Sequence, residues 1–271
     1  MSKSNEKINN NLLTFGGHLD VLRKLLIRIS LVVICVAIVV FVFKDLTFSI
    51  ILAPSESDFL TYRWIEKVVH LFNSNFHFDY FYVDLIATDL SSQFLTHMTV
   101  AIYLGLLCAS PFIIYELFKF VSPALYEHER KYSKKIIIIV YLLFIVGVLM
   151  SYYVLFPISF RFLGTYSVAE RVHSTITLDS YISTFTTLTL LLGLVFQLPI
   201  LAFIMAKMGI IEAYILVKYR RYAFLIILLV AAIITPPDIM TLLLVGIPLY
   251  LLYEVSIIVI RKTNTNRNIQ K

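Results

Sequence analysis

Six runs of mainly apolar residues are the feature that most constrains how this chain folds. An α-helix rises about 1.5 Å per residue, so roughly 20 apolar residues are needed to cross a hydrocarbon layer about 30 Å thick. The predicted membrane spans are residues 25–43, 95–118, 136–156, 185–206, 222–234 and 239–260. The first span contains Arg28 near its start, where a long cationic side chain reaches the membrane interface. The sequence therefore predicts an all-α, multi-pass membrane protein.

Composition supports the membrane prediction and excludes several other classes of protein. Apolar residues make up 59% of the 271 residues and charged residues 15%, whereas a soluble domain has about 25% charged residues. Cys35 and Cys108 lie far apart in apolar runs, so neither a disulfide framework nor a Cys-x-x-Cys metal site is expected. The charged residues, which give a net charge of +6, lie between the apolar runs and do not form one basic cluster in the sequence. We therefore expect a lipid bilayer, and no nucleic acid, as the surroundings of this chain.

The last two spans are separated by residues 235–238 (TPPD), which mark a helix boundary because proline cannot continue a helix. The fifth span is short, since its residues 222–234 reach only about 20 Å. Two interpretations are open. The two segments either cross a locally thinned bilayer or form a single hairpin that never crosses fully. We favour six true spans, with the fifth and sixth short.

Lysine and arginine set the predicted orientation, because cytoplasmic loops of membrane proteins carry an excess of these residues. With six spans, all but five of the 23 basic residues fall on the side of the two termini. The five on the opposite side are Lys44, Arg63, Lys67, Arg161 and Arg171. Both termini are therefore predicted to be cytoplasmic.

We expect one domain over residues 1–271, with one large outer loop at residues 44–93. About 20 mostly polar residues precede the first span and Lys44 follows it, which argues against a cleavable signal peptide. Within the loop, residues 62–72 carry apolar side chains at helical spacing, which predicts a helix on the membrane surface. Residues 76–85 alternate aromatic and polar side chains, which favours an extended segment.

Ionisable residues beside the spans are the first candidates for function, since each needs a partner near a membrane. Asp20 lies on a predicted amphipathic helix that leads into the first span. It either pairs with Arg23 or Lys24 on its own helix or is available to a ligand. Glu129 lies in the predicted cytoplasmic loop after the second span, and the residues three and four positions after it, Tyr132 and Ser133, are not basic. It is either a solvated surface residue or a carboxylate that binds an outside cation.

Gln197 is the candidate polar group inside a span. It lies about midway along the fourth span, where an isolated amide needs a hydrogen-bond partner across a helix interface. Packing within the chain and contact with a helix of another subunit are both open. Glu116 and Glu254 fall near the cytoplasmic ends of their spans. There an interfacial position suffices, or pairing with a nearby basic residue, Lys119, Arg261 or Lys262.

Patterns typical of enzymes and metal sites are missing from the sequence. The six histidines form no His-x-x-x-His or His-Glu-x-x-His arrangement, and there is no Gly-x-Ser-x-Gly or glycine-rich phosphate loop. We therefore predict no enzyme, no catalytic residue, no metal and no cofactor. A small secondary transporter with a polar intramembrane path is the alternative function. The repeated halves with matching broken helices that are typical of such transporters are not found.

Several segments resemble TatC, the family of multi-spanning receptor subunits of the twin-arginine protein translocase. They are residues 18–24 (HLDVLRK), 120–130 (FVSPALYEHER), 196–199 (FQLP), 235–238 (TPPD) and 247–254 (IPLYLLYE). The resemblance implies a glove-like fold of six helices in the bacterial inner membrane, with both termini cytoplasmic. It also implies a receptor for the twin-arginine signal peptides of folded proteins. Such a receptor self-associates, assembles with single-span TatA- and TatB-type subunits, and uses the proton gradient for export.

The resemblance also implies roles for single residues. The family's carboxylate in the loop after the second span falls on Glu129, and a carboxylate accepts two parallel hydrogen bonds from a guanidinium, a geometry that lysine cannot reproduce. Asp20 is the second candidate for binding the twin arginines. Neighbouring positions of the signal-peptide site fall on Phe120, Leu125 and Tyr126. Positions of importance for partner subunits or assembly fall on Pro54, Gln197 and Asp238.

Two positions depart from the family pattern. The family often reads His-Leu-x-Glu-Leu-Arg near its start, and its acid falls on Val21 here. Asp20 stands one residue earlier, and one step along a helix turns a side chain by about 100°. The family commonly has glutamate where Gln197 stands. Glutamine forms hydrogen bonds but does not titrate, which disfavours any mechanism that needs a proton at this position.

Overall fold

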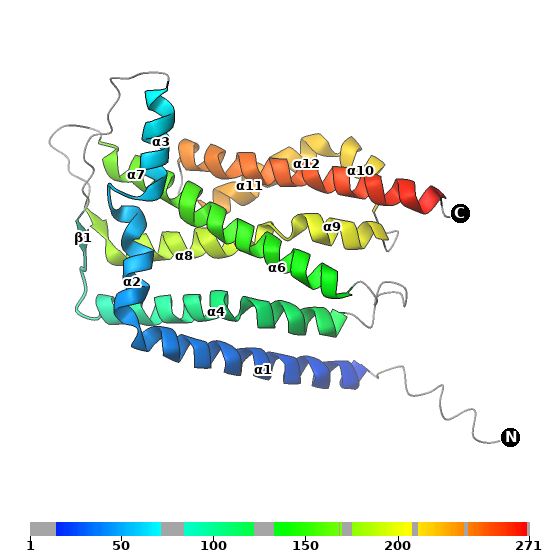
Figure 1. The fold of residues 1–271 in the computed structure, drawn as a ribbon, viewed down its shortest axis with the longest axis horizontal. Coiled ribbons are helices and arrows are strands. Elements are labelled where there is room, and N and C mark those ends of the chain that lie inside the picture. Colours follow the sequence, from blue (N-terminus) through cyan, green and yellow to red (C-terminus); the bar gives the residue numbers. More distant parts are fainter. Residues whose placement is uncertain are drawn as a thin grey trace. The chain divides into compact units, whose positions relative to one another are not determined.

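A computed structural model shows the fold (Figure 1), and it describes residues 15–71, 84–121, 133–167, 169, 175–207, 211–235 and 238–269. Five helical segments there are long and apolar enough to cross a membrane. They are Leu19–Val42, Ser92–Phe120, Ile136–Thr165, Leu178–Ala206 and Ile239–Arg261. The prediction of an all-α membrane protein is confirmed.

Each predicted span corresponds to a helix or to helices in sequence. These are α1 (Phe15–Val42), α4 (Ser92–Val121), α6 (Ser133–Met150) with the π-helical turn η3 (Ser151–Leu155) and α7 (Phe156–Thr165), α8 (Leu178–Val195) with α9 (Leu198–Lys207), α11 (Arg220–Ile234) and α12 (Ile239–Ile269). The short helix α10 (Ala213–Lys218) precedes α11. With 15 residues, α11 reaches about 22 Å and is shorter than the five long segments. The count of six spans therefore stays a prediction.

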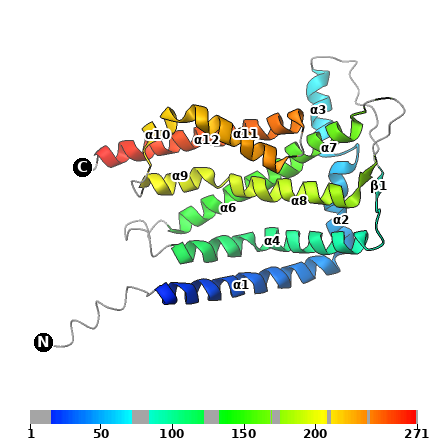
Figure 2. The ribbon, with the colours of Figure 1, turned by 180° about the vertical axis from the view of Figure 1, so that it is seen from behind.

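Contacts between residues divide the chain into two units. Unit 1 is Met1–Val42 with Ala101–Tyr141, and unit 2 is Phe43–Val100 with Leu142–Lys271. Within unit 1, α1 and the second part of α4 run side by side in opposite directions (Figures 1 and 2). A Cβ atom on Gly105 would lie 2.9 Å from the Cβ of Ala37, so only glycine allows this approach. Small residues of this kind let membrane helices pack closely.

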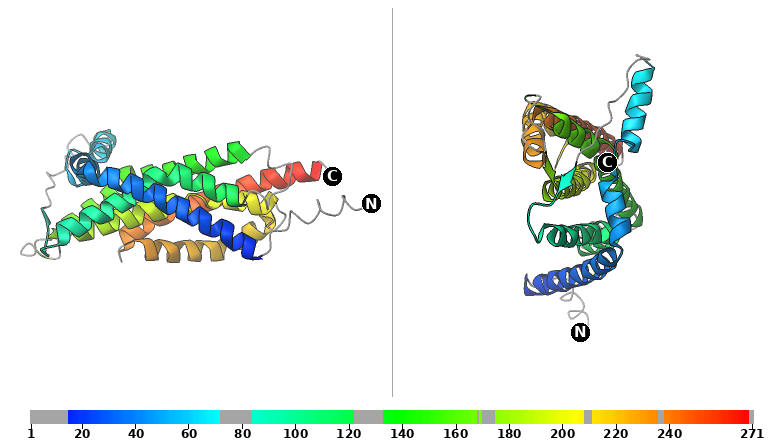
Figure 3. Two further views of the ribbon diagram at one scale, coloured as in Figure 1. Left: turned by 90° about the horizontal axis from the view of Figure 1, so that it is seen from below. Right: turned by 90° about the vertical axis from the view of Figure 1, so that its left-hand side faces the viewer.

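The predicted outer loop begins with helices in unit 2. They are α2 (Lys44–Leu52), the short 3-10 turn η1 (Ala53–Ser55) and α3 (Leu60–His70). Both α2 and α3 run across the direction of α8, as the two views of Figure 3 show. The predicted surface helix at residues 62–72 corresponds to α3, with its last residue outside the described part of the chain.

Most of the predicted extended segment, residues 76–83, also lies outside the described residues. Its end contributes strand β1 (Leu85–Ile86), which pairs in parallel with β2 (Ile176–Thr177). Leu85 lies opposite Ile176 in this pairing. The end of the outer loop is thereby joined to the residues just before α8.

Two tyrosines from distant parts of unit 2 donate hydrogen bonds to backbone carbonyl groups at the end of α2. The last four carbonyl groups of a helix have no partner within the helix. The hydroxyl of Tyr152, in η3, donates to the carbonyl oxygen of Ile50 at 2.7 Å. The hydroxyl of Tyr181, in α8, donates to that of Ile51 at 2.8 Å. These two bonds attach α2 to the long helices.

Tyr62 on α3 anchors the same region from the other side. Its buried hydroxyl lies 2.9 Å from the carbonyl oxygens of both Pro54 and Pro157, which share its hydrogen. Burial raises the pKa of Tyr62 well above its usual value, so the hydroxyl stays protonated and donates. The guanidinium of Arg161 lies over the ring, 5.1 Å from its centroid. The predicted assembly residue Pro54 is thus a structural part of this cluster.

Tyr62→Phe removes the shared hydrogen and leaves two carbonyl oxygens without this donor. We expect the free energy of unfolding to fall by about 1–3 kcal/mol, seen as a lower midpoint of thermal unfolding of the purified protein in detergent. Tyr214→Phe, at an exposed tyrosine on α10, is the matched control and should leave the midpoint unchanged. Equal midpoints for Tyr62→Phe and the wild type would contradict this role.

Two glycines set the contact between α6 and α8 in unit 2. A Cβ atom on Gly147 would lie 2.9 Å from the carbonyl oxygen of Leu192 and 2.9 Å from the Cγ of Phe196. A Cβ atom on Gly193 would lie 2.8 Å from the ring of Phe144. The two helices therefore approach as closely as their backbones permit.

Gly147→Ala forces these backbones apart, because the new methyl group meets a carbonyl oxygen that cannot rotate away. Overpacking of this kind costs about 1–3 kcal/mol, so we expect a clear fall in the unfolding midpoint. Gly246→Ala on α12 is the control, since its Cβ atom would meet Leu228 at an ordinary 3.4 Å. The account of this contact is wrong if both substitutions leave the midpoint where it is.

Candidate functional site

An ion pair in unit 1 joins the first part of α1 to the last part of α4. The Nη1 of Arg28 lies 3.2 Å from the Oε1 of Glu116. The Glu116 side chain is only 6% exposed, whereas that of Arg28 is 49% exposed. The sequence left an interfacial position or pairing with Lys119 open for Glu116, and the structure shows a partner on the neighbouring helix that neither alternative named.

Two predicted site residues lie on the same two helices as this ion pair. Asp20 precedes Arg28 by about two turns of α1, and Phe120 follows Glu116 by about one turn of α4. Because the two helices run in opposite directions, both residues lie on the same side of the ion pair, about 12 and 6 Å along the helices from it. Asp20 is exposed and Phe120 is partly exposed. The two residues therefore belong to one end of unit 1.

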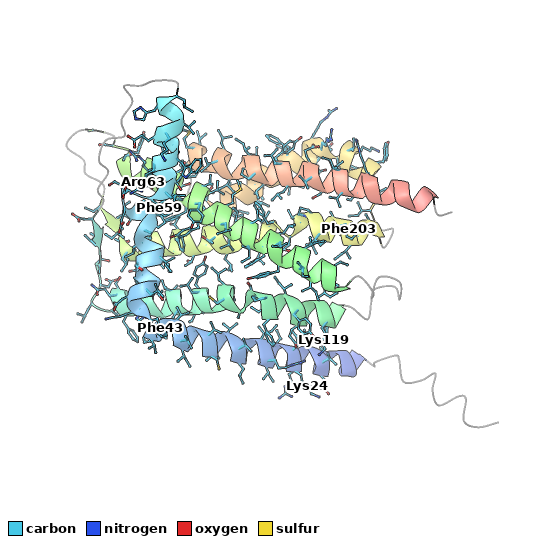
Figure 4. All side chains as sticks on the ribbon, viewed as in Figure 1. Lys24, Phe43, Phe59, Arg63, Lys119 and Phe203 are labelled. Atoms are coloured by element: carbon cyan, nitrogen blue, oxygen red, sulfur yellow. The ribbon has the colours of Figure 1, made fainter. Side chains whose placement is uncertain are left out.

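Basic side chains share that end of unit 1. Lys24 on α1 precedes Arg28 by four residues and Lys119 on α4 follows Glu116 by three, so both belong to that end (Figure 4). Asp20 forms no ion pair with Arg23 or Lys24 within the described part of the chain, so local pairing of Asp20 is not seen. Val21, at the family's acidic position, is exposed and apolar. The exposed Asp20 carboxylate is therefore open to a cationic ligand.

Three other predicted site residues, Leu125, Tyr126 and Glu129, lie outside the described residues. The segment that contains them follows the last residue of α4, Val121, and precedes the first residue of α6, Ser133. Both ends of the segment belong to unit 1.

Gln197 lies where the fourth long segment is interrupted between α8 and α9. Its Nε2 donates to the carbonyl oxygen of Gly193 at 3.4 Å, one turn back on its own helix. Its Oε1 is buried and has no hydrogen-bond partner among the residues that the structure describes. The expected partner across a helix interface is thus not found within this part of the chain.

Asp238 has a local structural role. Its carboxylate accepts a hydrogen bond from the backbone N–H of Thr241 at 2.7 Å, and the Thr241 hydroxyl donates to its other oxygen. Because α12 begins at the next residue, Asp238 is the N-cap of that helix. This bond satisfies one of the N–H groups that the first turn of a helix leaves without a partner.

Glu254 pairs across helices and not along its own. Its Oε2 lies 2.8 Å from the Nη2 of Arg220, and its Oε1 accepts a hydrogen bond from the Tyr250 hydroxyl at 3.2 Å. Arg220 is the first residue of α11, so the pair joins the start of α11 to α12. Arg220 is therefore a partner that the sequence did not indicate, since an interfacial position and pairing with Arg261 or Lys262 were the alternatives left open. Sequence spacing could not show this pair, because its members are 34 residues apart.

Comparison with known proteins decides the family. The sequence model of the Sec-independent protein translocase protein (TatC) matches residues 17–248. The chain belongs to the TatC family. It is 36% identical over 257 residues to the TatC protein of Blattabacterium sp. subsp. Periplaneta americana, which covers 93% of this chain and 96% of that protein. It is 32% identical over 248 residues to TatC of Carboxydothermus hydrogenoformans, which covers 91% and 92% of the two chains.

The fold agrees with this membership. A crystal structure of the twin arginine translocase receptor TatC matches with a TM-score of 0.72 and 28% sequence identity, over 91% of this chain and 99% of that chain. The resemblance found in the sequence is confirmed. The chain is therefore a multi-pass membrane component of a protein translocase, a transport subunit and not a catalytic enzyme. This favours the translocase prediction over the secondary transporter.

The Arg28–Glu116 pair should respond unequally to loss of either partner. Arg28→Gln leaves a buried carboxylate without a cation, whereas Glu116→Gln leaves a half-exposed guanidinium that extends to the interface. We expect Arg28→Gln to cost about 1–3 kcal/mol of unfolding free energy, and the second substitution Glu116→Gln to restore most of it. Thermal unfolding of the two single variants and the double variant in detergent measures this. Equal and additive losses would contradict the pairing.

Proposed function

We propose that this protein is the receptor subunit of a twin-arginine translocase. In this proposal it spans the bacterial inner membrane six times, has both termini in the cytoplasm, and binds twin-arginine signal peptides of folded proteins at its cytoplasmic face. The observation that carries the proposal is the match to the TatC receptor structure over 91% of this chain. The excess of basic residues on the side of the termini supports the orientation.

The chemistry of the proposed site follows from its charge pattern. The end of unit 1 carries lysines, so a cationic peptide binds there only where a carboxylate accepts its arginine directly. Glu129 is the first proposed ligand and Asp20 the second, each accepting forked hydrogen bonds from one guanidinium. Phe120 is partly exposed at this end and offers an aromatic face on which a guanidinium can stack. We place Leu125 and Tyr126 around the same peptide.

Assembly with TatA- and TatB-type single-span subunits is the second part of the proposal. Gln197 is the proposed contact, because its Oε1 lacks a partner in the described part of the chain and its side chain is partly exposed. A turn of the partly exposed side chain would bring this acceptor to a donor on a partner helix. Pro54 and Asp238 support assembly indirectly, by shaping η1 and starting α12. Self-association and export driven by the proton gradient complete the proposed role.

Export of a folded, twin-arginine-tagged reporter tests Glu129 in cells. Glu129→Ala removes the proposed guanidinium ligand, and loss of a hydrogen bond to a charged group costs about 1.5–3 kcal/mol. We therefore expect export to fall at least about tenfold while the variant accumulates in the membrane like the wild type. Glu127→Ala, two residues earlier in the same segment, is the matched control and should export normally.

Asp20→Ala in the same assay tests the second ligand. Partial loss of export, deepened in the double variant with Glu129→Ala, is the expected result. Normal export by Glu129→Ala would remove Glu129 from the site. Normal export by Asp20→Ala would show that the exposed acid has not taken over the role of the acid missing at Val21.

A further inference from the structure

A pocket of about 460 Å³ lies in unit 2 between α7, the start of α8 and the end of α11. Hydroxyl groups line much of it, from Ser159, Ser180, Ser183, Thr184, Thr187 and Thr235. Phe156, Phe160 and Leu163 supply apolar walls. None of its described lining residues is charged. Its volume lies within the range of about 300–1,000 Å³ that is typical of small-molecule sites.

Ser159 brings a buried hydroxyl to the wall of the pocket. The residue is 2% exposed, and its Oγ has no hydrogen-bond partner among the described residues. A helical serine usually donates to the carbonyl oxygen four residues back, but Ser159 does not. A buried hydroxyl without a partner is unfavourable, so an acceptor in the pocket stabilises the protein.

The pocket lies near the ends of three membrane-crossing or apolar helices. Ser159 is six residues before the end of the third long segment, which places it about 9 Å inside that segment. Thr187 is nine residues after the start of the fourth, about 13 Å inside. Ile234 and Thr235, at the end of the short helix α11, line the pocket as well. In the proposed six-span arrangement, on which this inference rests, α11 reaches only about 22 Å, so the boundary between headgroups and hydrocarbon would lie further inward beside it.

The geometry points to the glycerol-ester region of a phospholipid as the occupant. Ester carbonyl oxygens are uncharged acceptors that lie at the boundary between headgroups and hydrocarbon. Ser159 donates to one of these oxygens, and the walls formed by Phe156, Phe160 and Leu163 contact the attached acyl chain. The lining hydroxyls suit the ester groups and do not select a headgroup charge. The site would hold a lipid at the outer end of the short helix.

A pair of lipids that differ only in the ester tests this site. Short-chain phosphatidylethanolamine, and its diether analogue with the same headgroup and chains but no carbonyl oxygens, are titrated separately into the delipidated full-length protein in detergent. The readout is the shift of the thermal unfolding midpoint with lipid concentration. We expect the ester lipid to bind about fivefold more tightly than the diether lipid, as the loss of one hydrogen bond implies.

Ser159→Ala separates the hydroxyl from general lipid effects. Without lipid, the variant should be as stable as the wild type or more so, because it no longer buries an unpartnered hydroxyl. With lipid, it should bind the ester and diether forms equally. Ser110→Ala is the matched control. Ser110 on α4 is likewise buried, and its Oγ has no hydrogen-bond partner among the described residues, but it does not line the pocket.

Three results would overturn the assignment. The first is equal stabilisation of the wild type by the ester and diether lipids. The second is an unchanged preference for the ester lipid in Ser159→Ala. The third is loss of that preference in Ser110→Ala as well, which would show that removal of a buried serine hydroxyl outside the pocket has the same effect.

Discussion

In hydrocarbon, every backbone N–H and C=O group needs a partner inside the protein, because lipid offers none. This requirement makes the apolar runs helical and makes each interruption of a helix depend on a substitute donor or acceptor. The same need is met outside the predicted spans at the end of α2, where Tyr152 and Tyr181 donate to carbonyl groups that the helix itself leaves free. Asp238 does the same for the first turn of α12. These three polar side chains therefore form hydrogen bonds with backbone groups that a helix end leaves without a partner.

Charged groups beside the spans follow the same rule across helices. Glu116 meets Arg28 within unit 1, and Glu254 meets Arg220 within unit 2. Each pair joins two helices near an end, and neither carboxylate is left without a cation. Asp20 differs, because it is exposed and unpaired with its helical neighbours in the described part of the chain. Asp20 therefore stays a proposed ligand for a cationic peptide.

Hydropathy predicted the long helices of this protein, because length and apolar content decide what crosses a bilayer, but it gave no sign of the short helices α2 and α10. It underestimated the lengths of the helices, because a helix extends beyond its apolar part. The helix α1 begins ten residues before the predicted first span, and α7 continues to Thr165. The partners of Glu116 and Glu254 were missed because they are 88 and 34 residues away in sequence. The glycines at the α6–α8 contact were missed because each contacts residues that are far from it in the sequence, on the other helix of the pair.

The candidate site was predictable only in part. Spacing singled out Asp20 and Glu129, but the roles of Phe120, Leu125 and Tyr126 came from the family pattern. The structure places Asp20 and Phe120 at one end of unit 1 and does not cover Glu129. The N-cap at Asp238 follows a readable signal, an aspartate just before an apolar helix. The pocket around Ser159 could not be predicted, because its hydroxyls come from three helices.

Binding of a signal peptide to the purified full-length protein tests the central claim most directly. Two peptides are compared, identical except that one carries the twin arginines and the other carries two lysines in their place. Both have the same charge, so only the forked hydrogen bonds of the guanidinium separate them. The receptor account predicts at least about tenfold tighter binding of the twin-arginine peptide, with the preference lost in Glu129→Ala. Equal affinity for the two peptides would contradict it.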